Sequence, residues 1–130
     1  MAAAVLVDSN FFIARQRRNL DPFAELNEFA GQHEFLTCGM ITMEVLRGVL
    51  SPRVAQRYQL GFSVMIYVPT TSRTWDLATD IALSLDRKGT PIPPQDSLIA
   101  AHALQAGAAV LTFDTDFRRI PGLTILEFPG

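Results

Sequence analysis

The sequence predicts an α/β protein, a three-layer α/β/α domain with a mainly parallel central sheet. Short apolar segments of strand-like composition alternate with longer helix-like segments along the 130 residues. Hydrophobic residues make up 48% of the chain, enough for one sizeable core without disulfides. Because no internal repeat or linker interrupts the alternation, we expect a single domain over residues 1–130.

Five short apolar segments are predicted to form the strands. The first is a run of small apolar residues that ends at Asp8, and the third is closed by Pro69, as expected for strands bounded by turns. The third and fourth segments have the composition of buried strands. The expected strands are residues 2–7, 34–38, 64–68, 109–112 and 123–128.

The segments between these strands have helical signals. Ser9 with Asn10, Asp21 with Pro22, and Thr74 should begin helices, because such residues favour the N-cap and proline favours the first turn. The segment 40–50 is apolar nearly all round, which predicts a buried helix. The expected helices are residues 9–13, 21–30, 40–50, 53–60, 74–85 and 95–107.

Four acidic residues occupy positions where apolar segments meet turns or helix starts. Asp8 and Asp114 follow predicted strands, Asp96 lies in the first turn of a predicted helix, and Glu44 lies beside apolar residues of another. Ligands in α/β folds bind at the carboxyl ends of strands, so we expect these acids to meet there. Together they would repel and lose hydration unless protons or cations offset that cost. Oxygen-only ligands favour Mg2+ or Mn2+.

Each acid also has an ordinary interpretation when taken singly. Asp8 could be a helix cap, Glu44 an edge charge, and Asp96 a first-turn residue favoured by the helix dipole. Asp114 could simply form a turn. Asp116 is either a fifth acid at the rim of the site or a cap on a short turn at Phe117.

The net charge of −2 argues against a generally basic nucleic-acid binder, yet the basic residues are grouped. The three groups are candidates for contacts with phosphate: Arg15, Arg17 and Arg18; Arg47, Arg53 and Arg57; and Arg87 with Lys88. Cys38 is the only cysteine, and no stretch has the pattern of a secretion signal or of a membrane span. We therefore expect a cytoplasmic protein that is not in a membrane.

Several motifs resemble those of the PIN-domain family, specifically of the VapC-type toxin ribonucleases from bacterial toxin and antitoxin pairs. The resemblance begins with a strand followed by Asp8-Ser9-Asn10, and continues with a helical Glu44 followed by Gly48. Its most specific part is the block Asp96-Ser-Leu-Ile-Ala-Ala-His-Ala-Leu, followed by Gly107-Ala and by Leu111-Thr-Phe-Asp-Thr-Asp-Phe117. The match extends over nearly the whole chain.

The resemblance implies an endoribonuclease that depends on Mg2+ or Mn2+ and cleaves RNA with metal-activated water. It implies the toxin of a type II toxin–antitoxin pair, a homodimer, and a VapB-like antitoxin whose arm covers the acidic groove. Apolar residues at 11–13 and 49–60 could serve that interface. The expected catalytic and metal-binding acids are Asp8, Glu44, Asp96 and Asp114, with Asp116 as a further metal ligand. The expected supporting residues are Ser9, Asn10 and Thr112, and the expected phosphate contacts are Arg47, Arg87 and Lys88.

An alternative remains open: a catalytically inert or non-toxin PIN-like module that binds RNA without cutting it. A haloacid dehalogenase phosphatase is a weaker rival, since its Asp-x-Asp motif should open the chain, whereas Asp114 and Asp116 lie near the end. No Cys and His spacing suggests zinc, and no glycine-rich loop suggests a nucleotide cofactor.

Overall fold

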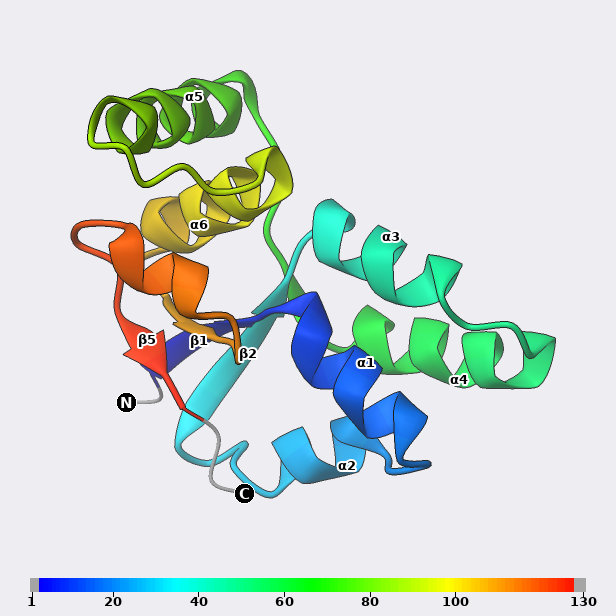
Figure 1. The fold of residues 1–130 in the computed structure, drawn as a ribbon. Coiled ribbons are helices and arrows are strands. Elements are labelled where there is room, and N and C mark those ends of the chain that lie inside the picture. The colour runs from blue at the N-terminus through cyan, green and yellow to red at the C-terminus, as the bar shows by residue number, and fades with distance from the viewer. Residues whose placement is uncertain (1–2, 128–130) are drawn as a thin grey trace.

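A five-stranded sheet forms the centre of the fold (Figure 1). The computed structural model describes residues 3–127 of the chain. The strand order is β3-β2-β1-β4-β5, and each described pair of neighbours is parallel. The strands are β1 (Ala3–Val7), β2 (His33–Thr37), β3 (Ile66–Tyr67), β4 (Ala109–Leu111) and β5 (Ile125–Leu126).

Helices cover both faces of the sheet, which confirms the predicted three-layer α/β/α fold (Figure 1). Helix α6 packs directly against β1 and β4, and α5 packs on α6. On the other side, α1 contacts α2 and α3, and α3 contacts α4. The helices are α1 (Ser9–Arg17), α2 (Pro22–Asn27), α3 (Gly39–Arg47), α4 (Pro52–Ser63), α5 (Ser72–Arg87) and α6 (Pro94–Ala106), with a 3-10 helix η1 (Thr115–Arg119). None of the described helices is long and apolar enough to cross a membrane.

The order of the strands creates a crevice between β1 and β4. From β1 the chain proceeds outward to β2 and β3, whereas β4 and β5 are added on the opposite side of β1. Such a reversal leaves a gap between the connections at the carboxyl ends of the two strands, where α/β proteins bind ligands. The register pairs Val7 with Leu111, and the Asp8 N–H donates to the Leu111 carbonyl at 2.9 Å. Asp8 and Thr112 therefore lie side by side at this edge.

Several predicted elements differ from those observed. Helix α5 is capped by Thr71, and Thr74 is the third helical residue, whose hydroxyl completes a capping box by accepting from the Thr71 N–H. Strand β3 has two exposed residues instead of five buried ones, because it lies at the edge of the sheet. Strand β5 is also shorter than predicted, and the predicted end of that strand at residue 128 lies outside the described residues.

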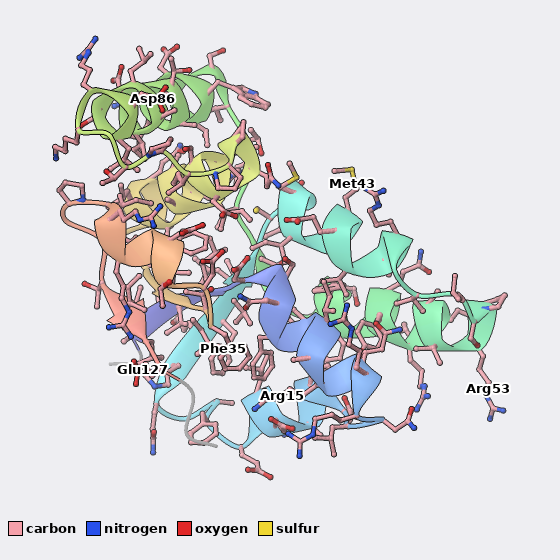
Figure 2. The ribbon with its side chains drawn as sticks, in the orientation of Figure 1. Arg15, Phe35, Met43, Arg53, Asp86 and Glu127 are labelled. Carbon is pink, nitrogen blue, oxygen red and sulfur yellow. The ribbon has the colours of Figure 1, made fainter. Side chains whose placement is uncertain are left out.

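The prediction that the third helix is buried on nearly all sides is wrong. Only one face of α3 is buried, through Ile41 and Val45. Met43 is 54% exposed, and its side chain points away from the protein (Figure 2). Apolar composition alone does not bury a helix. In a small fold, an outer helix is covered by other residues on only one of its faces. Glu44 nevertheless lies partly buried at the edge of the covered face.

Candidate metal centre

Three of the predicted acids converge at the carboxyl edge of the sheet. Asp96, Asp114 and Asp116 each offer a carboxylate oxygen, and these oxygens all lie within 4.8 Å of one another. Asp96 is in the first turn of α6, whose start is set by Pro93 and Pro94. Asp114 follows β4 and caps η1 by accepting from the Asp116 N–H at 2.9 Å. The start of α6 and the start of η1 thus together supply one group of oxygen ligands.

A hydroxyl group connects this cluster to Asp8. Thr112 Oγ1 donates to Asp8 Oδ2 at 2.8 Å and accepts from the Asp114 N–H at 3.0 Å and from Asn10 Nδ2 at 3.1 Å. The Ser9 N–H donates to the other Asp8 oxygen at 2.8 Å. A threonine hydroxyl has one donor and two acceptor positions, so all of them are used here. The residues predicted as supporting the acids, Ser9, Asn10 and Thr112, therefore do contact Asp8 or its partner.

Glu44 reaches the same region from α3. Its Oε1 atom is buried and has no hydrogen-bond partner among residues 3–127. Burial raises the pKa of Glu44, and the nearby charge of Asp8 raises it further, whereas the charge of Arg47 and a hydrogen bond from the Ser9 side chain oppose the rise. A buried carboxylate oxygen without a partner is costly, and a bound cation would satisfy it.

Burial and neighbouring charge both raise the pKa values of Asp96 and Asp8. Burial together with the charges of Asp8, Asp114 and Asp116 raises the pKa of Asp96 to about 7. The pKa of Asp8 is also raised by its burial, although the hydrogen bonds from Thr112 and Ser9 counteract this. Like charges in a poorly solvated place favour protonation, and a cation bound among them would reverse that preference.

The residues present fit a divalent metal ion. The donors are carboxylate oxygens, the ligands that hard cations such as Mg2+ and Mn2+ prefer. Asp96, Asp114 and Asp116 are close enough to coordinate one ion together, while Asp8 and Glu44 act on the group through their charges. The acidic group can therefore hold a divalent cation.

Asp116 belongs to the cluster and does not cap the turn at Phe117. The cap of η1 is Asp114, so the alternative interpretation of Asp116 as the cap is wrong. Asp116 Oδ1 also lies 3.4 Å from Arg119 Nη1, which donates in turn to the Pro91 carbonyl at 3.1 Å. Asp116 is thus shared between the acidic cluster and a basic residue at the rim.

The predicted basic contacts have different surroundings. Arg47 ends α3, is exposed, and lies close enough to Glu44 for its charge to lower the pKa of that acid. Arg87 and Lys88 are exposed at the end of α5, and in the described part of the chain neither forms an ion pair. Arg15 is buried, so its expected role as a solvent-facing phosphate contact is wrong.

Arg15 instead belongs to a structural cluster that the sequence analysis missed. Its Nε donates to Glu25 Oε2 at 3.0 Å, and its guanidinium lies 4.6 Å from the centre of the Phe11 ring and 5.3 Å from that of Phe113. Phe113 stands directly between Thr112 and Asp114. The sequence places an aromatic residue, Phe113, inside the acidic block, but no local pattern links this residue to Arg15.

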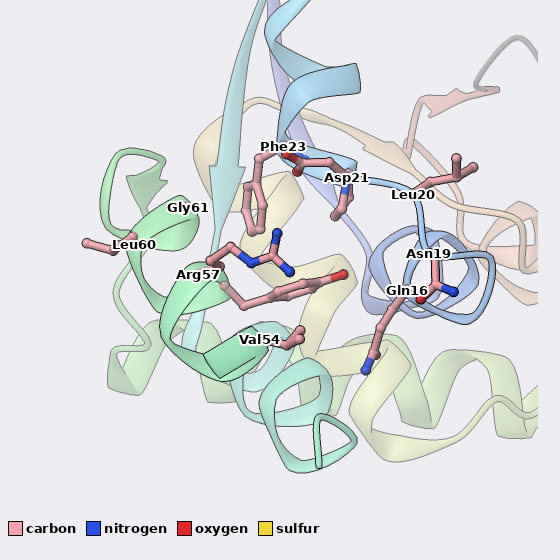
Figure 3. A pocket seen from close by; sticks show the side chains of 11 residues that line it. Gln16, Asn19, Leu20, Asp21, Phe23, Val54, Arg57, Leu60 and Gly61 are labelled. Carbon is pink, nitrogen blue, oxygen red and sulfur yellow. The ribbon is translucent and has the colours of Figure 1, made fainter. Parts of the chain in front are cut away.

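A separate groove of about 440 Å³, lined by both apolar and polar residues, lies between α1, α2 and α4 (Figure 3). Phe23 and Val54 line its interior, and Leu60 lies at its edge. None of the predicted acids lines it. Phe11 and Phe12, expected at an exposed interface, are fully buried, whereas Leu50 and Leu60 are 93% and 68% exposed. An apolar interface in this region would therefore use the α4 side.

A family profile described as PIN domain matches residues 5–123, most of the chain. The chain belongs to the PIN domain family. All five predicted acids lie within the matched segment, which also spans the crevice between β1 and β4. The resemblance identified from the sequence motifs is therefore confirmed at the family level.

Two relatives of this chain are named as nucleases. Over 129 residues, 93% of this chain and 94% of the relative, the protein is 29% identical to ribonuclease VapC4 of Mycobacterium tuberculosis. Over a shorter segment of 49 residues, 37% of each chain, it is 48% identical to the tRNA(fMet)-specific endonuclease VapC of Salmonella typhimurium. These similarities place the chain among PIN proteins that resemble VapC nucleases.

Two solved VapBC structures share the fold of this chain. The VapBC structure from Salmonella typhimurium, bound to DNA, aligns with a TM-score of 0.80 at 26% identity and covers 98% of both chains. The VapBC2 structure from Rickettsia felis, bound to a DNA fragment from its promoter, aligns with a TM-score of 0.82 at 19% identity and covers 97% of this chain and 99% of that one. The latter similarity is one of fold.

Proposed function

We propose that this protein is a metal-dependent endoribonuclease and the toxin of a type II toxin–antitoxin pair. The observation that carries the proposal is the convergence of Asp96, Asp114 and Asp116 within 4.8 Å at the crevice beside β1. Similarity to ribonuclease VapC4 along nearly the whole chain supports RNA as the substrate. An inert binding module would have no evident need for acids that destabilise one another.

The acids supply the chemistry of phosphodiester hydrolysis. A divalent cation bound there supplies Lewis-acid stabilisation of charge on the phosphate and lowers the pKa of coordinated water. Asp96, Asp114 and Asp116 would hold the cation, and the Thr112 hydroxyl fixes the orientation of Asp8 beside them. Asp8 or Glu44, whose charges act on this group although neither belongs to it, would accept a proton from the attacking water.

The RNA backbone would lie across the carboxyl edge of the sheet. Arg47 at the end of α3 is the best placed of the predicted phosphate contacts, because its charge already acts on Glu44. Arg87 and Lys88 could contact more distant phosphates from the end of α5.

We also propose a VapB-like antitoxin as partner, a homodimer and a cytoplasmic location. The groove between α1, α2 and α4 combines apolar residues such as Phe23 and Val54 with the charged Asp21 and Arg57, and it suits an antitoxin segment that has an apolar side with polar residues beside it (Figure 3). Several solved structures with this fold are VapBC complexes, which supports such a partner. Exposed apolar residues such as Met43 and Trp75 provide surface for a second copy.

The proposal is tested by incubating purified protein with total cellular RNA in Mg2+ or Mn2+. The wild type should produce discrete fragments, and EDTA should abolish them. Asp96→Asn keeps the size of the side chain but removes a ligand charge, so its cleavage rate should fall more than about a hundredfold. If a folded wild type leaves the RNA intact with either metal, the nuclease assignment is wrong and the inert module is favoured.

A further inference from the structure

Phe113 is an aromatic residue that the fold leaves exposed beside the acidic cluster. It is 46% exposed, whereas Phe11, Phe12 and Phe117 are fully buried. It directly precedes Asp114 and directly follows Thr112, and its N–H donates to Asn10 Oδ1 at 3.4 Å. The backbone of Phe113 is therefore fixed by the same groups that orient the acids.

The Phe113 ring packs against two buried side chains, those of Arg15 and Phe11. The Arg15 guanidinium lies over the ring at 5.3 Å from its centre, and the Phe11 ring lies 6.3 Å away at 30° to it. Arg15 is itself held by Glu25 of α2 and is only 5% exposed. The ring therefore contacts two buried side chains, while nearly half of the Phe113 side chain remains exposed as an aromatic surface.

A hollow of about 210 Å³ adjoins Phe113 and Asp114. Ile125 gives it an apolar wall, and Arg118 and Glu127 form an ion pair at its rim. Glu127 extends from the end of β5 (Figure 2). A nucleobase has a flat apolar face and a polar edge. The aromatic surface and the aliphatic wall match the face, and the donor and acceptor groups match the edge.

We propose that Phe113 and this hollow bind one nucleobase of single-stranded RNA beside the phosphate that is cleaved. This inference rests on the proposed ribonuclease function. Phe113 would stack against the base, while Arg118 would donate to, and Glu127 accept from, its edge. A base paired within a duplex cannot expose its face, so the site selects unpaired RNA.

The experiment compares two substitutions of Phe113, one that removes the aromatic ring but stays apolar and one that keeps the ring. Phe113→Leu retains packing against Arg15 but lacks an aromatic face, whereas Phe113→Tyr retains that face. Binding is measured by fluorescence anisotropy with a labelled, mixed-sequence 12-nucleotide single-stranded RNA in Mg2+, each variant combined with Asp96→Asn to prevent cleavage. Stacking on aromatic side chains predicts at least about a fivefold weaker affinity for Phe113→Leu and less than about a twofold change for Phe113→Tyr.

Leu83→Ala is the matched control, since Leu83 is also 46% exposed but lies on α5. Its affinity should equal that of the Asp96→Asn parent. Equal affinities for Phe113→Leu and the parent, with thermal midpoints unchanged, would overturn the nucleobase site. Absence of RNA binding by the parent would overturn it as well.

Cleavage by proteins with Asp96 intact separates this inference from the proposed function. The ends of the fragments are sequenced to obtain the base preference at the cut. Phe113→Leu should raise KM, and Glu127→Gln should change the preferred base next to the cut. If the wild type cleaves RNA and both variants keep its KM and base preference, the nuclease stands and the nucleobase site is wrong. If the wild type cleaves nothing, the proposed function itself fails.

Discussion

The Thr112 hydroxyl is the residue-scale feature that joins the two strands of the candidate site. It is 5% exposed and contacts the buried carboxylate of Asp8, the backbone of Asp114 and the amide of Asn10. Thr112, which directly follows strand β4, thus fixes the relative positions of acids that come from opposite ends of the sequence. The positions of the acidic side chains therefore depend on the uncharged side chain of Thr112.

Thr112→Val should weaken both stability and catalysis. Valine has the same shape but leaves a buried carboxylate oxygen and two donors without their partner, which should lower the free energy of unfolding by about 1–3 kcal/mol. Loss of a group that orients a metal-site acid should lower kcat/KM by roughly tenfold to a hundredfold. Urea unfolding and RNA cleavage measure the two effects. Thr79→Val, on the exposed side of α5, should stay within about 0.5 kcal/mol of the wild type.

Asp96 should destabilise the metal-free protein at high pH. Its pKa is raised to about 7 in the folded state from the ordinary value of 3.8, so the folded state binds the proton more tightly than the unfolded state does. Stability from this group is therefore present at low pH and is lost as the pH rises from about 4 to above 7. In EDTA, Asp96→Asn should raise the melting temperature at pH 8 and change it much less at pH 5. An equal gain at both pH values would contradict this explanation.

The residues of the site differ in how far they could be predicted. The acids stand next to apolar segments and turns, so the sequence pattern and the family resemblance both indicate them. Asp116 could be a ligand or a cap, and only the placement of Asp114 at the start of η1 decided against the cap. Arg15 was assigned to the surface because a charged residue usually lies there. Its contacts with Glu25 and Phe113 depend on tertiary packing that no local pattern encodes.

At the scale of elements, α4 packs closely on α2 through a glycine. A Cβ atom added to Gly61 would lie 2.6 Å from three atoms of the Phe23 ring. That ring cannot easily move, because it packs against Phe12, Tyr58 and Phe62. Phe23 and Gly61 both line the groove between α1, α2 and α4.

Gly61→Ala should therefore destabilise the protein despite the better helix propensity of alanine. Overpacking costs about 1–3 kcal/mol, and the propensity gain of up to about 1 kcal/mol offsets only part of it. Gly48→Ala is the matched control, since the nearest atom to its added Cβ is a carbonyl oxygen 3.6 Å away. The two variants are compared by urea unfolding. A Gly61→Ala protein as stable as Gly48→Ala would show that Phe23 can relax.

Whether a segment forms a helix or a strand was easier to predict than its first and last residues or its burial. Asp21 with Pro22 marked the start of α2 correctly, because the cap and the proline act within a few residues. The position of β3 at the sheet edge explains why its apolar residues are exposed, and this position depends on strand order. The exposure of Met43 on α3 was missed for the same reason, since it depends on which face of the helix contacts the rest of the protein.

At the scale of the whole molecule, strand order turns scattered acids into one site. Alternating strands and helices predicted a parallel sheet, and parallel strands place their carboxyl ends at one edge. The order β3-β2-β1-β4-β5 then opens the crevice between Asp8 and Asp114. The sequence pattern does not specify strand order, so it could predict that these acids meet but not the separation of their oxygens.

The central claim, that these acids form one divalent metal site, is tested most directly by counting bound Mn2+ through the electron paramagnetic resonance signal of the free ion. Wild type should bind Mn2+, and Asp114→Asn should bind it at least about tenfold more weakly because a charged ligand is lost. Asp21→Asn is the control, since it makes the same chemical change at an exposed helix cap that is outside the cluster. It should bind as the wild type does. Equal Mn2+ binding by wild type and Asp114→Asn would contradict the account.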